Sequence, residues 1–95
     1  LWRMPLHKPY RRMIDSKFAD INNSGDSPFA GAITAALFLA DFVDPSTRWL
    51  HLDIMAWNGR ARPGRPEGGE AVAIRGLYAL IADLAERERG KGKKR

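Results

Sequence analysis

The sequence contains one histidine and two aspartates that could act together. His51 and Asp53 are two residues apart in an alternating apolar stretch, so they share one face if that stretch is a strand. Asp20 lies near them if a second predicted strand is the neighbour. Imidazole and carboxylate groups bind divalent metals. Because no further ligands are evident, we favour a structural interpretation in which His51 bonds within the sheet and Asp53 bonds loop amides.

A second candidate is an arginine- and glycine-rich loop that leads into a helix. Arg60, Arg62 and Arg65 alternate with glycines and prolines. Free amides at a helix N-terminus attract anions. Glu67 and Glu70, however, occupy the predicted first turn and already serve that role. The loop also matches neither a Walker loop nor a dinucleotide fingerprint, so an anion-binding domain is only a third alternative.

Nucleophilic catalysis is the third kind of chemistry to consider. It needs a serine, threonine or lysine beside a base. The serines and threonines of this chain have no recognisable elbow motif and no base at a suitable spacing. The residues alone therefore indicate no enzyme.

The composition is that of one small soluble domain. The chain has 95 residues, of which 44% are hydrophobic and 28% charged. The absence of cysteine excludes a disulfide framework and any cysteine-ligated metal. The longest apolar stretch, residues 29–43, is too short to cross a bilayer, and the start has no signal-peptide pattern. We therefore expect a cytoplasmic protein and, because Leu1 is not methionine, a piece of a longer one.

The formal charge of +5 comes mostly from one end of the chain. Residues 86–95 hold six basic and two acidic residues, whereas the rest holds ten basic and nine acidic ones. Terminal runs of this kind are usually solvated. We expect residues 90–95 to form a basic disordered tail, and nucleic-acid binding by it is the less favoured interpretation.

Helix and strand signals alternate along the chain, which predicts an α/β fold. The order is helix, strand, helix, strand, helix, at residues 9–17, 18–21, 28–43, 49–55 and from Glu67 or Glu70 to 89. Asp26 or Ser27 can cap the helix at residues 28–43, and Gly90 is the natural stop of the last helix. The glycine- and proline-rich residues between 57 and 69 are predicted to be a loop.

These elements are incomplete as a stand-alone fold. A strand–helix–strand unit implies parallel strands with a right-handed crossover. Two strands make no stable sheet alone, so we expect them to join a larger sheet. The helix at residues 28–43 is apolar nearly all round, which indicates burial on more than one side.

Four blocks of the sequence closely resemble the leucyl (cytosol) aminopeptidase family. They are WRMPL at residues 2–6, SKFADINN at 16–23, AGAITAALFL at 30–39 and WLHLDI at 49–54. The resemblance covers nearly the whole chain except the basic tail. It implies that residues 1–89 are the C-terminal portion of an aminopeptidase catalytic domain, a mixed sheet sandwiched by helices.

The resemblance also implies an activity. The family removes N-terminal residues from peptides with two divalent metal ions, zinc or manganese, that activate a bridging water. The full-length proteins are cytoplasmic and assemble as hexamers. The metal ligands and the catalytic lysine and arginine lie in upstream blocks, including one of the form N-T-D-A-E-G-R, and none of these blocks occurs in this chain. We therefore expect no catalytic residue, no metal ligand and no activity in this segment alone.

The resemblance places three residues in the substrate pocket. Met55 falls where the family commonly has a small alanine, and Asn58 falls at a second position of the pocket for the N-terminal side chain. Ser24 falls at a position lining the pocket for the next residue. Met55 and Asn58 depart from the family pattern, as does the segment EGGE at residues 67–70. These departures bear on substrate preference and leave the reaction class unchanged.

Considered without the resemblance, the residues also allow a protein that is not an enzyme. The chain could be a non-enzymatic interaction or nucleic-acid-binding module that uses its basic tail. An upstream block with lysine and aspartate ligands would favour the aminopeptidase, and a stop codon shortly upstream would favour the module.

Overall fold

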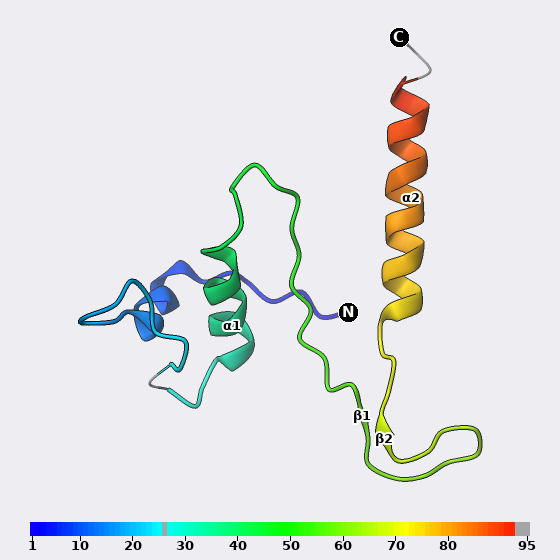
Figure 1. Ribbon diagram of the computed structural model, residues 1–95, viewed down its shortest axis with the longest axis horizontal. Coiled ribbons are helices and arrows are strands. Elements are labelled where there is room, and N and C mark those ends of the chain that lie inside the picture. The colour runs from blue at the N-terminus through cyan, green and yellow to red at the C-terminus, as the bar shows by residue number, and fades with distance from the viewer. Residues whose placement is uncertain (26, 93–95) are drawn as a thin grey trace. The chain divides into compact units, whose positions relative to one another are not determined.

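A short 3-10 helix and one α-helix form the first part of the fold. The computed structural model describes residues 1–25 and 27–92, which fall into two units, Leu1–Asp53 and Ile54–Arg95 (Figure 1). The order of elements is η1 (Lys8–Ile14), α1 (Gly31–Ala40), β1 (Trp57–Asn58), β2 (Gly68–Gly69) and α2 (Ile74–Gly92). The fold is thus mixed, with two helical segments in the first unit and a small sheet and a helix in the second.

The first helix is tighter and shorter than the sequence predicts. Pro9 stands in its first turn, where a missing N–H costs nothing. The helix ends at Ile14 because the Ser16 hydroxyl accepts hydrogen bonds from the N–H groups of Phe18 and Ala19, at 3.3 and 3.1 Å. Such side-chain turns compete with helix continuation. The prediction of a helix to residue 17 is therefore wrong at its end.

The strand predicted at residues 18–21 is wrong as well. This segment bends back instead, and the Asn22 N–H donates to the carbonyl of Ile14 over 2.8 Å. The Phe18 side chain is exposed. The apparent alternation covered only four residues, too few to outweigh the turn made by Ser16.

The helix predicted at residues 28–43 is confirmed in its central part as α1. Its beginning is delayed because Ala30 adopts the left-handed conformation, with φ of 58°. The Ser27 hydroxyl accepts the Phe29 N–H in the turn before it, rather than capping α1. Asp26, the other predicted cap, lies outside the described residues.

After α1, Ser46 donates its hydroxyl and N–H to Asp44, and these two hydrogen bonds lower the pKa of that carboxyl.

The core of the first unit lies between η1 and α1. Ile14 of η1 packs with Ile33 and Leu37 of α1, and partly buried neighbours surround this cluster. Arg11 supports the contact from the surface, because its guanidinium pairs with Asp41 at the end of α1 over 2.8 Å. The two elements are thus joined by apolar burial and one ion pair.

Residues 49–55, predicted as the clearest strand, form no strand in the described part of the chain. The rings of Trp49 and His51 nevertheless stack, with centroids 6.4 Å apart and planes 9° apart. These two side chains therefore share a face, as the alternation predicts. A strand also needs a hydrogen-bonded neighbour, and the pairing with residues 18–21 is not made.

The second unit contains an antiparallel hairpin where the sequence predicted a loop. Trp57 pairs with Gly69 and Asn58 with Gly68. Between the strands, Arg62 and Arg65 exchange two backbone hydrogen bonds of 2.8 Å, and Gly64 has φ of 70°. Proline followed by a glycine with positive φ is the pattern of a type II turn. The sheet is thus a local antiparallel pair and not the predicted parallel unit.

The last helix, α2, starts and ends later than predicted. Glu67 and Glu70 lie outside it, because Gly68 and Gly69 form β2 and Ala73 turns into the left-handed conformation just before Ile74. The helix continues through Gly90 to Gly92, so the predicted stop at Gly90 is wrong. An ion pair of 2.8 Å between Asp83 and Arg87 supports its exposed side. The rest of the predicted tail, residues 93–95, lies outside the described residues.

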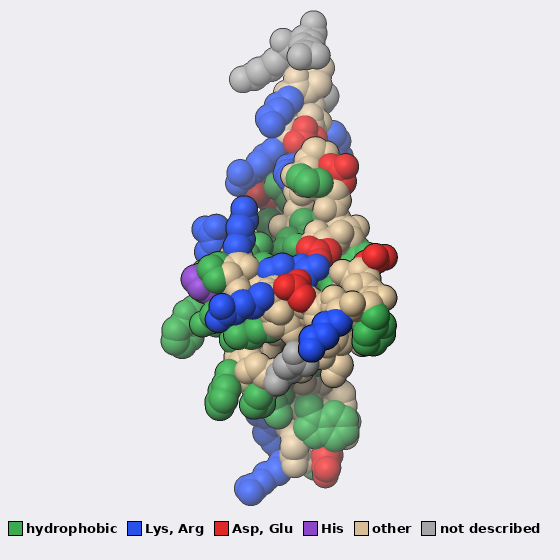
Figure 2. Space-filling model, turned by 90° about the vertical axis from the view of Figure 1, so that its left-hand side faces the viewer, with side chains coloured by type: hydrophobic (Ala, Val, Ile, Leu, Met, Phe, Trp, Pro, Cys, Tyr) green, Lys and Arg blue, Asp and Glu red, His purple; other side chains and the backbone are tan. Residues whose placement is uncertain are grey.

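Apolar side chains are mostly exposed in the described part of the chain. Only Ile14, Ile33, Ala36 and Leu37 are buried there, whereas α2 buries no residue. Figure 2 shows hydrophobic side chains at the surface, between lysines, arginines and carboxylates. No helix within the described ranges has both the length and the hydropathy that crossing a bilayer requires. Exposed apolar surface of this extent is typical of interaction sites.

Candidate functional site

The three predicted pocket residues are divided between the two units. Ser24 belongs to the first unit, in the loop that follows η1. Its N–H donates to the Asn22 side-chain carbonyl over 2.9 Å, which fixes the turn, and the Ser24 side chain is exposed. Met55 and Asn58 belong to the second unit. Their common pocket with Ser24 stays a prediction.

Met55 stands at the surface directly before the hairpin. Its side chain is 85% exposed. The next residue, Ala56, has φ of 48°, and its carbonyl accepts the Glu70 N–H over 2.8 Å. The backbone beside Met55 is therefore held by the hairpin while the thioether is free to contact another group.

Asn58 lies inside the hairpin. It is only 6% exposed and is the one buried polar side chain among the described residues. Its amide nitrogen Nδ2 donates to the carbonyls of Arg65 and Pro66, at 3.2 and 2.7 Å. The side chain therefore spans the hairpin from β1 to the residues before β2, a role that the sequence did not indicate.

His51, Asp53 and Asp20 do not form a metal centre in the structure. Among residues 1–25 and 27–92, no group of three or more histidine, aspartate or glutamate side chains could hold an ion. His51 stacks on Trp49 instead, and Asp53 and Asp20 are both exposed. This ring contact is not the hydrogen bond within a sheet that the structural interpretation assigns to His51, and that hydrogen bond stays a prediction.

Two arginines of the arginine-rich loop pair with a carboxylate of the same hairpin. Glu70 pairs with Arg65 and, over 3.5 Å, with Arg62. Its predicted place in the first turn of a helix is wrong, because Glu70 follows β2 and α2 begins only at Ile74. The ion pairs of Glu70 with Arg62 and Arg65 therefore form across the hairpin and not at a helix N-terminus.

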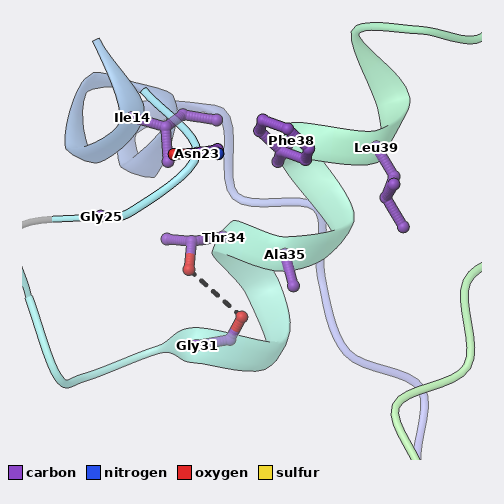
Figure 3. A pocket seen from close by; sticks show the side chains of 8 residues that line it. All are labelled: Ile14, Asn23, Gly25, Gly31, Thr34, Ala35, Phe38 and Leu39. Atoms are coloured by element: carbon purple, nitrogen blue, oxygen red, sulfur yellow. Dashed lines mark hydrogen bonds between the residues drawn. The ribbon is translucent and has the colours of Figure 1, made fainter. Parts of the chain in front are cut away.

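A pocket that the sequence did not indicate lies in the first unit, with a volume of about 250 Å³. The Thr34 side chain of α1 points toward the loop that carries Asn23 and Gly25 (Figure 3). Its lining is Ile14, Asn23, Gly25, Gly31, Thr34, Ala35, Phe38 and Leu39. The single O–H of Thr34 lies within hydrogen-bonding distance of the Ala30 and Gly31 carbonyls, at 3.3 and 3.2 Å, so its proton is engaged within α1 and the oxygen can still accept. Small residues four apart in α1, Gly31 and Ala35, are the signal that could have located the pocket.

A family model described as "Cytosol aminopeptidase family, catalytic domain" matches residues 1–78. The chain belongs to the cytosol aminopeptidase family. The resemblance seen in the four sequence blocks is therefore confirmed. A "Probable cytosol aminopeptidase" of Synechococcus sp. (strain WH7803) is 45% identical over 87 residues, which are 90% of this chain and 17% of that protein. One of the same name from Caulobacter vibrioides is 45% identical over 89 residues, covering 90% of this chain and 18% of that protein.

A solved cytosol aminopeptidase follows the same course. The 1.8 Å crystal structure of the cytosol aminopeptidase from Coxiella burnetii is 50% identical, with a TM-score of 0.77. The match covers 86% of this chain but 18% of that one. This chain thus spans less than a fifth of the length of these cytosol aminopeptidases.

Proposed function

We propose that this chain is the C-terminal segment of the catalytic domain of a metal-dependent, leucyl-type aminopeptidase. The full-length protein would release N-terminal amino acids from peptides in the cytoplasm. The observation that carries this proposal is the match to the Coxiella burnetii cytosol aminopeptidase at 50% identity and a TM-score of 0.77. The catalytic domain would be a mixed sheet sandwiched by helices, and residues 49–55 would find their strand partner in its upstream part.

The metal ions of the proposed reaction do not fit the residues present here. Two divalent ions, zinc or manganese, need several carboxylate ligands close together. The described residues offer no group of three such side chains. The proposal therefore assigns the ligands of both ions, and the catalytic lysine and arginine, to the part of the protein upstream of this segment.

The segment itself would supply scaffold and part of the substrate pocket. Met55 is the residue best suited to contact a substrate side chain, because its flexible thioether is exposed beside a fixed backbone. Ser24 would line the pocket for the next residue of the peptide. Asn58 falls at a pocket position by the resemblance, but its side chain is turned into the hairpin, so it would contribute to the pocket through the backbone that it holds.

Exposed apolar side chains support assembly with more protein. They occur in both units, from Trp2 and Phe18 to Trp57 and Ile81. Burying such side chains contributes about 25 cal/mol per Å², which is the main favourable term in folding and association. We propose that the upstream catalytic domain covers most of them and that the full-length protein is a homo-oligomer, a hexamer.

The metal dependence is tested on the full-length protein that carries this segment. It is expected to hydrolyse leucine p-nitroanilide, to lose that activity on dialysis against a chelator, and to regain it with zinc or manganese. Calcium serves as the control ion, because its preference for six to eight oxygen ligands suits a two-metal hydrolase poorly. Undiminished hydrolysis after complete removal of metal, verified by elemental analysis, would contradict the proposed metal dependence.

A further inference from the structure

The hairpin of the second unit holds one polar side chain in its interior. Asn58 is 6% exposed, and its Nδ2 hydrogens are both directed at backbone carbonyls, those of Arg65 and Pro66. A primary amide has two N–H donors, so both are satisfied inside the hairpin. A side chain engaged in this way has no donor left for a substrate.

These two hydrogen bonds join the two sides of the hairpin where no backbone hydrogen bond between them is present. β1 and β2 pair only at Trp57–Gly69 and Asn58–Gly68, and the next backbone pair is the turn between Arg62 and Arg65. Pro66 has no N–H with which to extend the ladder. The Asn58 amide therefore joins the turn to the strands across the gap.

The same hairpin fixes the backbone next to Met55. The Glu70 N–H donates to the Ala56 carbonyl, directly after the Trp57–Gly69 pair. Ala56 is held in the left-handed conformation, which costs energy for a residue with a Cβ and needs support from its surroundings. Loosening the hairpin at Asn58 removes part of this support three residues from Met55.

We propose that Asn58 is a positioning residue that locks residues 59–67 and thereby sets the position of Met55, the side chain that selects the substrate's N-terminal residue. The effect on the substrate rests on the proposed function, whereas the locking of the loop does not. Asn58 acts on specificity through Met55 and not as a wall of the pocket.

Limited proteolysis of the full-length protein tests the lock without reference to activity. Trypsin cleaves poorly before proline, and Arg62 and Arg65 each precede one, so Arg60–Ala61 is the cleavable bond of this loop. Asn58→Leu and the isosteric Asn58→Asp both remove the donor. Cleavage that produces a fragment beginning at Ala61 is expected to accelerate roughly fivefold to thirtyfold, since it follows the population of the open loop.

Two control variants bracket this result. Glu70→Gln removes the ion pairs with Arg62 and Arg65 but keeps both Asn58 bonds, so its cleavage is expected to rise less. Asn23→Leu makes the same substitution at an exposed asparagine of the other unit and should leave cleavage at Arg60 unchanged. If Asn58→Asp, folded with a cooperative melting transition, is cut at the wild-type rate, the lock does not exist.

A double-mutant cycle tests the link to Met55. The measured quantity is the ratio of kcat/KM for phenylalanine and alanine amidomethylcoumarins. Asn58→Asp is expected to change this ratio in wild type and to leave it unchanged in a Met55→Ala background, because its effect passes through Met55. Additive effects in the two backgrounds would overturn the positioning role. Absence of all aminopeptidase activity would overturn the proposed function, while the proteolysis still decides the lock.

Discussion

The isolated 95-residue chain is expected to hydrolyse no leucine p-nitroanilide above the buffer blank, with or without added zinc or manganese. Polarising a carbonyl and activating water with two metals requires a set of carboxylates and a lysine held together. No group of three potential ligands occurs among the described residues, and the buried core there comprises four side chains. Loss of the whole metal centre removes the full rate enhancement, which for enzymes is typically at least about a millionfold.

The control for this assay is the full-length protein at the same molar concentration. Contaminating peptidases could also hydrolyse the substrate. The Asp20→Asn, Asp53→Asn double variant of the 95-residue chain, purified in parallel, therefore measures the hydrolysis that such contaminants cause. Metal-dependent turnover by the wild-type chain that disappears in this double variant would contradict the expectation. It would indicate that Asp53 and Asp20 are metal ligands, and a His51→Ala variant would then test His51.

The second large effect is expected from Met55→Ala in the full-length protein. Met55 is exposed beside a fixed backbone, and truncation to alanine enlarges the proposed pocket by several methylene equivalents. Each methylene of a substrate that fills this space contributes about 0.8 kcal/mol, or roughly fourfold in kcat/KM. The kcat/KM for phenylalanine substrates should therefore rise relative to that for alanine substrates.

A panel of aminoacyl amidomethylcoumarins measures this change in preference. Met55→Leu is the matched control, because it conserves volume and apolar character and should keep the wild-type ranking. An unchanged ranking in Met55→Ala with a lower overall rate would show that Met55 packs in the folded protein and does not line the pocket.

The helical part of the fold could be predicted because its signals are local. Helix α1 follows from the apolar spacing that buries Ile33 and Leu37. Its ends differ from the prediction because Ala30 is left-handed and because the N–H groups of residues 41–43 bond to the third residue back. A strand depends on a partner as well as on its own pattern. Residues 49–55 keep the predicted shared face of Trp49 and His51 but make no ladder in the described chain.

The hairpin has a turn signal in the sequence that the prediction of a loop did not use. Pro63 and Gly64 are the residues that a type II turn prefers, yet the surrounding glycines and arginines were interpreted as a loop. The interior position of Asn58 follows from that hairpin, so it could not be predicted without it. The resemblance supplied Met55, Asn58 and Ser24 as pocket positions, which no pattern of spacing or charge in this chain indicates.

The most direct test of the central claim is a graft. Residues 1–78 of this chain replace the matching segment of the Coxiella burnetii cytosol aminopeptidase, and leucine p-nitroanilide hydrolysis is compared with the parent and with a parent truncated before the segment. We predict chelator-sensitive activity within about tenfold of the parent, a change of about 1.4 kcal/mol in activation free energy, and none for the truncated protein. A graft that melts cooperatively and assembles like the parent but hydrolyses nothing would contradict the claim that this segment serves an aminopeptidase.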